Sequence, residues 1–320
     1  MGWVVIRHKQ NIVYRAFVSL SLILISCYVA LLSGCATHST AMQVNDQGLS
    51  YWHGGRYDLA EESLQQALEQ ARKDYGPTHF GVGVILSNQG LVYTDQGRYA
   101  EAIDVFQQAD PILMRKYGNS DPTYAQSLNN YAYALLRNGN LEEAKNKYEE
   151  SISVYADAGT PEADTVNVIN GLSMAYRDGG DLDKAESLAS KALRLIKSND
   201  REWDYKGPIF QNLGTIYMEQ SSFEKSENTY IQLLEVRKKK LGISHPKTGY
   251  TVWGLASLYK KEGKNEQAEE QYKRAIEIFD RRLPQGHPDT NQLVVQYADF
   301  LRSVGRDDEA AVLEQSHHEQ

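Results

Sequence analysis

The histidines and paired carboxylates of this 320-residue sequence are the side chains that could do catalytic chemistry, but their spacing fits neither a catalytic nor a metal site. His79, His245 and His287 lie tens of residues apart, at junctions between predicted helical units. Adjacent glutamates such as Glu142 and Glu143 fall on the exposed sides of predicted helices, where they are solvated and share no proton. No nucleophile elbow, zinc-protease or phosphate-loop motif occurs. We therefore expect no enzyme activity, no cofactor and no metal, and a structural role for the three histidines.

Two further features offer weaker sites for chemistry. His317 and His318, at the polar tail of residues 316–320, could bind a metal weakly, although a frayed chain end explains them better. Residues 199–207 look irregular, but nine residues are too few to hold a hidden active site.

The chain has 34 basic and 42 acidic residues and a net charge of −8. We expect no nucleic-acid partner, because such a partner needs a basic face.

The two cysteines, Cys27 and Cys35, lie in a segment that has the order of an export signal. Residues 1–15 carry three basic residues and no acid, and residues 16–32 carry no charge. A short transmembrane anchor is the alternative, but a spanning helix usually needs about 20 apolar residues. With its only cysteines here, the rest of the chain has no structural disulfide.

The sequence Leu32-Ser33-Gly34-Cys35 resembles the lipobox of bacterial lipoproteins, in which two small residues precede the cysteine. The resemblance implies a signal peptide over residues 1–34, cleavage before Cys35 and acylation of its thiol. Acyl chains hold a protein on a bilayer without a spanning helix. Residues 35–40 are then the acylated cysteine and a short linker. Ala36 in place of Asp implies the outer membrane of a bacterial cell envelope, facing the periplasm.

A glycine-centred phrase recurs along the rest of the chain every 41 or 42 residues. It begins as Gly55-Arg56-Tyr57, and its turns fall near residues 55, 97, 139, 180, 221, 263 and 305. Small residues recur five positions after each turn and seven before it, which lets facing helices approach closely. We predict a helix, a tight turn and a second helix in each unit, and units that stack because none buries its apolar face alone. The two series of small residues are Ala60, Ala102, Ala144, Ala185, Ser226, Ala268 and Ala310, and Gly48, Gly90, Ala132, Ser173, Gly214, Ala256 and Ala298.

Prolines mark the junctions between units, and two features depart from the repeat. Pro122, Pro161, Pro246 and Pro288 are expected where a helix begins, because proline lacks an N–H that the first helical turn does not need. The residues before the first two, Asp121 and Thr160, are expected to cap the free amides. Pro111 interrupts a well-patterned second helix and should kink it or end it early. The fifth unit has Ser221-Ser222 where the others have the turn glycine.

These residues resemble the tetratricopeptide repeat, in its 42-residue, kinesin-light-chain-like variety. The matching phrases are Leu-Asn-Asn-Tyr-Ala over 128–132, Gly-Arg-Tyr-Asp-Leu-Ala-Glu over 55–61 and Lys-Leu-Gly-Ile-Ser-His-Pro over 240–246. The resemblance covers residues 41–315. It implies an all-α fold, a right-handed superhelical α-solenoid of about seven helix–turn–helix repeats, whose first helices line the concave face.

Amide side chains gather on the predicted concave face, at positions two and three residues before the small residue. An amide offers both a donor and an acceptor to the backbone of an extended peptide. The alternative is that these amides satisfy the repeat's own helices and loops. The candidate partner-binding residues, with a tyrosine and a methionine that add apolar contact, are Asn88, Asn129, Asn130, Tyr133, Asn170, Met174 and Asn212.

A basic stretch over residues 237–264 is the second candidate surface, with eight basic residues and one acid. It is either a solvated helix end, where cations suit the helix dipole, or a docking patch for an acidic protein segment or anionic lipid. The sequence thus predicts a lipid-anchored scaffold that binds a protein or peptide; the alternative is an envelope-assembly or secretin-pilot-like lipoprotein of the same architecture. The basic residues are Arg237, Lys238, Lys239, Lys240, Lys247, Lys260, Lys261 and Lys264.

Overall fold

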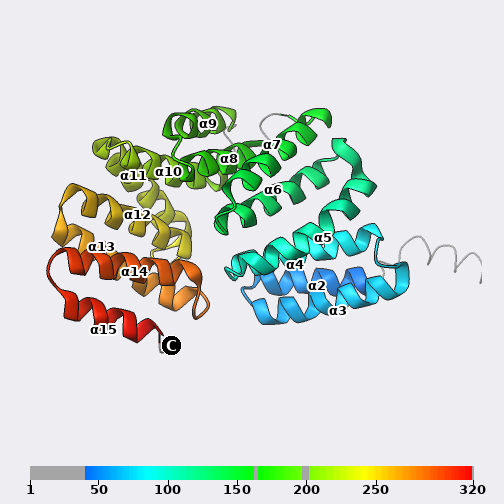
Figure 1. The fold of residues 1–320 in the computed structure, drawn as a ribbon, viewed down its shortest axis with the longest axis horizontal. Helices are drawn as coiled ribbons and strands as arrows, with labels where there is room; N and C mark the ends of the chain where they lie inside the picture. Colours follow the sequence, from blue (N-terminus) through cyan, green and yellow to red (C-terminus); the bar gives the residue numbers. More distant parts are fainter. Residues whose placement is uncertain (1–39, 162–164, 197–201, 319–320) are drawn as a thin grey trace, which may run out of the picture. The chain divides into compact units, whose positions relative to one another are not determined.

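The computed structural model describes residues 40–161, 165–196 and 202–318, which form 14 α-helices and no strand (Figure 1). The predicted signal peptide, Cys35 and most of the predicted linker lie outside the described residues. No described helix is both long and apolar enough to span a bilayer. The helices are α2 (Thr40–His53), α3 (Tyr57–Tyr75), α4 (Phe80–Asp95), α5 (Tyr99–Tyr117), α6 (Pro122–Arg137), α7 (Leu141–Asp157), α8 (Val166–Asp178), α9 (Leu182–Leu195), α10 (Glu202–Glu219), α11 (Phe223–Leu241), α12 (Pro246–Glu262), α13 (Asn265–Arg282), α14 (Pro288–Ser303) and α15 (Asp307–His318).

The helices pair as the repeat predicts, and the chain divides into two compact units. The first unit, Met1–Gly76, contains the pair α2 and α3, and the second, Pro77–Gln320, contains the six pairs from α4 to α15. The second helices of the seven pairs begin at a spacing of 41 or 42 residues, which confirms the period. Within the second unit each pair packs against the next, so the all-α solenoid is confirmed.

The tight turn inside each pair places one residue in the left-handed backbone region. Gly97, for example, has φ of 76° and donates to the carbonyl of Thr94 at 3.0 Å. Glycine is favoured there because it has no Cβ to clash. In the fifth pair Ser221 takes this place with φ of 60°, and Ser221 N–H donates to the carbonyl of Met218 at 3.1 Å. The turn is therefore kept without its glycine, at a cost in backbone strain.

The small residues face each other inside the pairs as predicted. A Cβ added to Gly90 would lie 2.5 Å from Cζ of Phe106, so the phenyl ring occupies the space left by the glycine. The hydroxyl of Ser226 donates to the carbonyl of Gly214 at 2.7 Å, across the same kind of contact in α10 and α11. The two small-residue series are therefore the lines along which the paired helices approach each other.

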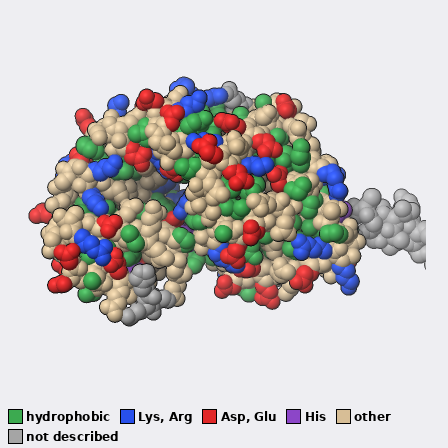
Figure 2. Space-filling view, viewed as in Figure 1, with side chains coloured by type: hydrophobic (Ala, Val, Ile, Leu, Met, Phe, Trp, Pro, Cys, Tyr) green, Lys and Arg blue, Asp and Glu red, His purple; other side chains and the backbone are tan. Residues whose placement is uncertain are grey.

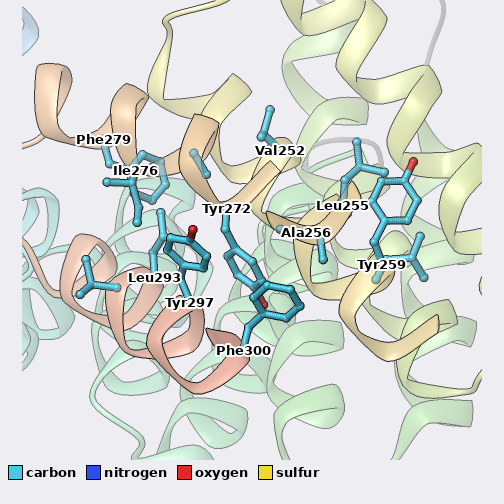
Figure 3. Packing of buried hydrophobic residues seen from close by; sticks show 14 of the residues in the cluster. Val252, Leu255, Ala256, Tyr259, Tyr272, Ile276, Phe279, Leu293, Tyr297 and Phe300 are labelled. Atoms are coloured by element: carbon cyan, nitrogen blue, oxygen red, sulfur yellow. The ribbon is translucent and has the colours of Figure 1, made fainter. Parts of the chain in front are cut away.

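The hydrophobic core runs between successive helices. In the last repeats, stacked aromatic rings and aliphatic side chains from α12, α13 and α14 fill the space between helices (Figure 3). Tyr272 and Tyr297 stack with ring centroids 5.4 Å apart, and both rings contact Phe300. Such stacking adds to the stabilisation that burial of the rings provides.

Histidine and aspartate side chains cap the helices that start at the junctions. Nδ1 of His79, His245 and His287 accepts a backbone N–H two residues later, at 3.1–3.2 Å, and an Asp121 carboxylate oxygen accepts from Thr123 N–H at 2.7 Å. These contacts satisfy amides that a helix start leaves without a partner. The histidines have the structural role that we predicted.

The structure describes the helix that contains Pro111 and the residues on either side of the junction at Pro161. Helix α5 continues past Pro111 to Tyr117, so Pro111 does not end it early. Thr160 and Pro161 lie outside the described helices, and residues 162–164 are not among the described residues. Helix α8 begins at Val166, and the side chain of Thr165 before it makes no cap hydrogen bond. Tertiary packing supports α5 beyond its proline and α8 from its first residue. Leu113, beyond the proline, is buried, and Val166 and Ile169 belong to the core with α9 and α10.

Candidate functional site

The first helices of the pairs in the second unit share one face, which we call the first-helix face. It is formed by α4, α6, α8, α10, α12 and α14, which contact one another in this order up to α12. Figure 2 shows the surface hollowed near the centre of the view, between the segments that Figure 1 labels α6 and α12. The predicted partner-binding residues all lie on helices of this face.

Two of the predicted amides are buried and join neighbouring repeats. Asn170 and Asn212 are 5% and 2% exposed, and Asn212 Nδ2 donates to Oδ1 of Asn170 at 3.2 Å. The same amide donates to the hydroxyl of Ser173 at 2.9 Å, while its oxygen accepts from the Arg177 guanidinium at 2.8 Å. All these contacts link α8 to α10. At these two positions the amides serve the solenoid, which was the alternative we left open.

The remaining predicted residues are half-buried on the same face. Asn130 Oδ1 accepts from Gln126 at 3.1 Å, and Asn129 lies beside it. Asn88, Tyr133 and Met174 are likewise partly open to solvent. Half-buried amides, an aromatic ring and a thioether form a surface on which a peptide can find both hydrogen bonds and apolar contact.

The predicted basic surface is formed by lysines alone. The side chains of Lys238, Lys239, Lys240, Lys247 and Lys261 are exposed at the ends of α11 and α12. Lys260 is half-buried, and Lys264 pairs with Glu262 at 3.1 Å and Glu227 at 3.6 Å. The three lysines in the last turn of α11 also lie where the helix dipole stabilises positive charge.

Arg237 differs from its lysine neighbours because it is buried between α10 and α12. Its Nη1 donates to Gln211 Oε1 at 2.8 Å, to the carbonyl of Lys247 at 2.6 Å and to the Thr251 hydroxyl at 2.6 Å. Burial lowers the pKa of the guanidinium to about 10, so Arg237 stays charged at neutral pH. Its contacts tie the start of α12 to α10, and it is not part of the exposed basic surface.

A buried polar cluster, which we call the clasp cluster, brings together residues that are far apart in the sequence. Arg137 at the end of α6 forms an ion pair with Asp289, in the first turn of α14. The other Asp289 oxygen accepts from the hydroxyl of Tyr250 on α12. The Asp289 side chain is 3% exposed and that of Arg137 is 25% exposed. This cluster therefore connects three helices across the first-helix face.

Aromatic rings and a histidine enclose the clasp cluster. The Arg137 guanidinium lies over the ring of Tyr99, 4.8 Å from its centroid, and donates to the Tyr133 hydroxyl at 3.2 Å. Burial raises the pKa of Tyr250 well above its usual range, and the Asp289 carboxylate raises it further. The Tyr250 hydroxyl thus stays protonated and donates. His287 Nε2 lies 3.3 Å from the carbonyl oxygen of Asp95, at the end of α4.

Sequence reasoning missed the clasp cluster, because no local pattern shows a contact between residues 152 positions apart. Asp289 follows the His-Pro phrase of its junction and looks like any acidic first-turn residue. Within the described residues no group of three or more histidines, cysteines and acidic residues could hold a metal ion. The groups of the cluster can pair opposite charges and form hydrogen bonds, and here they form a contact between repeats.

Sequence profiles of one repeat family match most of the chain. The profile described as Tetratricopeptide repeat matches residues 39–112, 123–198 and 209–281, and one described as Tetratrico peptide repeat matches residues 250–320. No curated protein matches the chain.

Several solved structures share the fold. A Rap protein complexed with Competence and Sporulation Factor is 13% identical, over 86% of this chain and 73% of that chain, with a TM-score of 0.65. The apo form of the quorum sensor NprR from B. thuringiensis is 14% identical over 98% of both chains, with a TM-score of 0.60. PilW, a widely conserved type IV pilus biogenesis factor, is 16% identical over 76% of this chain and 96% of that chain, with a TM-score of 0.52. At these identities the likeness shows the fold alone.

Proposed function

Because the chain belongs to the tetratricopeptide repeat family, we propose that it is a non-enzymatic scaffold that binds a segment of a protein partner on the first-helix face. The observation that carries the proposal is the hollowed first-helix face, whose half-buried amides, ring and thioether suit an extended segment (Figure 2). The same fold holds a bound factor in the Rap structure. The binding residues are Asn88, Asn129, Asn130, Tyr133 and Met174, with Asn170 and Asn212 holding the helices that carry them.

The exposed lysines at the ends of α11 and α12 are the competing surface. They would dock an acidic segment or anionic lipid through charge alone, and such binding weakens with salt. The half-buried surface of the first-helix face offers directional hydrogen bonds as well as apolar contact, and for that reason it is the better candidate for a specific protein segment.

The chain is further proposed to be attached to a bacterial envelope membrane through acylated Cys35, in the outer membrane facing the periplasm. The lipobox-like residues 32–35 support this attachment. Cys35→Ser removes the thiol that would take the acyl chain, so we expect an unprocessed or soluble protein. A Cys35→Ser protein that still fractionates with lipid after alkaline washing would contradict the attachment.

Envelope assembly is a second candidate role, because PilW, a type IV pilus biogenesis factor, has the same fold. It differs from the general proposal in the identity of the partner: an assembly factor would capture a component of an envelope complex. The experiment below identifies that partner.

Capture of the partner tests the binding surface. The immobilised protein is incubated with envelope extract, and the bound proteins are compared for the parent and two triple variants. The first variant combines Asn129→Ala, Asn130→Ala and Met174→Ala. The second combines Lys238→Glu, Lys239→Glu and Lys240→Glu. We expect the first variant to lose a specific band that the second retains, since each lost hydrogen bond costs about 0.5–1.5 kcal/mol. Loss in the lysine variant alone would place the site on the basic surface.

A further inference from the structure

The contact between the start of α14 and the ends of α4 and α6 stands apart from the rest of the packing. The helices of the second unit pack against helices next to them in the chain, or one pair away. The start of α14, by contrast, meets side chains and a carbonyl group that lie 152 and 192 residues earlier in the sequence. Two distant parts of the stack are thus joined by a few side chains.

The chemistry of this contact is mostly polar. Asp289 accepts from Arg137 and Tyr250, and His287 reaches the carbonyl oxygen of Asp95. Pro288 makes an apolar contact, since a Cβ added to Gly97 would lie 2.3 Å from the proline Cδ. A polar contact of this kind exchanges protein partners for water when it opens, so its net free energy is small. A large apolar interface would hold the two parts together much more firmly.

We propose that Arg137, Asp289, Tyr250 and His287 form a releasable clasp that in a closed state holds the start of α14 against the ends of α4 and α6, and that its release, the open state, widens the first-helix face for a partner segment. The existence of closed and open states rests on the clasp contacts alone. Only the link to partner entry rests on the proposed function. A partner that enters between α6 and α14 has to separate Arg137 from Asp289, so the clasp regulates access.

In the closed state the ion pair exchanges its water for protein partners. In the closed state the Asp289 carboxylate is almost fully buried, and Arg137 and Tyr250 supply the hydrogen bonds that replace its water. In the open state both charges return to water. Removal of one partner is different, because it leaves the other charge buried without compensation in the closed state. Variants at either position should therefore shift the population toward the open state.

His287 makes the clasp sensitive to pH. In the closed state its Nδ1 accepts the Asp289 N–H, and its Nε2 faces the Asp95 carbonyl oxygen, an arrangement that suits the neutral ring with hydrogen on Nε2. Protonation would place a second hydrogen on Nδ1 and remove the cap. The groups that face the ring are Asp289 and Asp95, which favour the cation, and Arg137, which opposes it. Burial has the largest effect, and it lowers the pKa of His287 below 6.5.

The lowered pKa of His287 in the closed state determines the sign of the pH effect. The closed state binds the proton less well than the open state, where the imidazole is in water. Closure is therefore fully favoured above pH 6.5 and is lost as the pH falls from 6.5 toward the lower pKa of the closed state. Acid should open the clasp.

A distance measurement between spin labels tests the clasp. The full chain carrying Cys27→Ser and Cys35→Ser is kept in detergent, and labels are attached at Ala100→Cys on α5 and Gln292→Cys on α14, both exposed positions. At pH 7.5 we expect one short distance. Arg137→Ala and Asp289→Ala should each add a longer distance, and the double variant should open less than Arg137→Ala, because it leaves no buried charge without a partner.

Matched variants distinguish opening of the clasp from a general weakening of the packing between helices. Lys147→Met removes another ion pair between helices, with Asp110 at 2.7 Å, but this pair joins successive repeats and should leave the label distance unchanged. His287→Asn keeps a capping oxygen that does not titrate, and it should remain closed at pH 5.5, where the parent opens. His245→Asn changes the equivalent cap of α12 and should open at pH 5.5 as the parent does.

The outcomes decide the proposal as follows. An unchanged distance in both Arg137→Ala and Asp289→Ala, with circular dichroism showing the parent's helix content, overturns the clasp. Should one variant fail to fold, the other carries the same test. Opening of His287→Asn at pH 5.5 overturns the role of His287. No partner is present in this experiment, so a failure of the proposed function would appear in the capture experiment and not here.

Discussion

At the scale of single residues, side chains of the same type on the first-helix face differ in burial and therefore in role. Asn170 and Asn212 have the same amide group as Asn129 and Asn130, and the repeat places Asn170 at the position of Asn129 and Asn212 at the position of Asn130. Burial separates them: the first two pair across α8 and α10, whereas the second two stay half-buried. Sequence alone could not distinguish them, because the pairing depends on how closely two helices approach.

The amides of the two kinds should respond differently to truncation. Asn212→Ala removes hydrogen bonds to Asn170, Ser173 and Arg177 in a buried site, so we expect a loss of about 1–3 kcal/mol in the free energy of unfolding. Asn130→Ala, on the half-buried surface, should change it by no more than about 0.5 kcal/mol. Urea unfolding followed by circular dichroism measures both. Equal losses in the two variants would show that burial does not separate their roles.

Ser221 provides a second test at this scale. Its positive φ is strained for a residue with a Cβ, whereas glycine adopts this conformation freely. We expect Ser221→Gly to stabilise the protein by about 1 kcal/mol, seen as a higher thermal midpoint. The reverse change at an equivalent turn, Gly139→Ser, should destabilise by a similar amount through backbone strain alone, since Gly139 has φ of 86° and a Cβ added there would meet no atom within 4 Å. A lower midpoint for Ser221→Gly would contradict the strain.

At the scale of helices, the sequence predicted where pairs turn and touch, but not every boundary. The turn phrase and the small residues specify local geometry, which short segments encode directly. Pro111 does not end its helix early, which was one of its two expected effects, and Pro161 lies outside the described helices. Proline lowers the local preference for helix without deciding where it ends, because buried neighbours such as Leu113 and Val166 can override it.

The close approach of paired helices predicts a strong effect at Gly90. Gly90→Ala would bring a methyl group against the ring of Phe106, so we expect a loss of about 1–3 kcal/mol in the free energy of unfolding. The control is Gly207→Ala in α10, where the nearest atom to an added Cβ is 3.8 Å away. That variant should lose less stability than Gly90→Ala, because no ring packs against the added methyl group. Phe106→Leu should restore part of the stability lost in Gly90→Ala.

At the scale of the whole molecule, repetition made the fold predictable from the sequence. Seven copies of one pattern in register determine the architecture, since each unit must stack on its neighbours. The clasp cluster was not predictable, because Arg137 and Asp289 meet only through the summed geometry of the repeats between them. The position of a long-range contact in a solenoid depends on small rotations between repeats, which no single segment encodes.

Photocrosslinking in living cells tests whether a partner segment lies on the first-helix face. A photoreactive amino acid is placed at Met174 on the first-helix face, at Lys239 on the basic surface, or at Ile231, an exposed position on the second helix α11. After illumination, we predict a discrete crosslinked protein from the Met174 position and none from Ile231 or Lys239. Crosslinking from Lys239 or Ile231 with none from Met174 would contradict the assignment of the first-helix face as the binding surface.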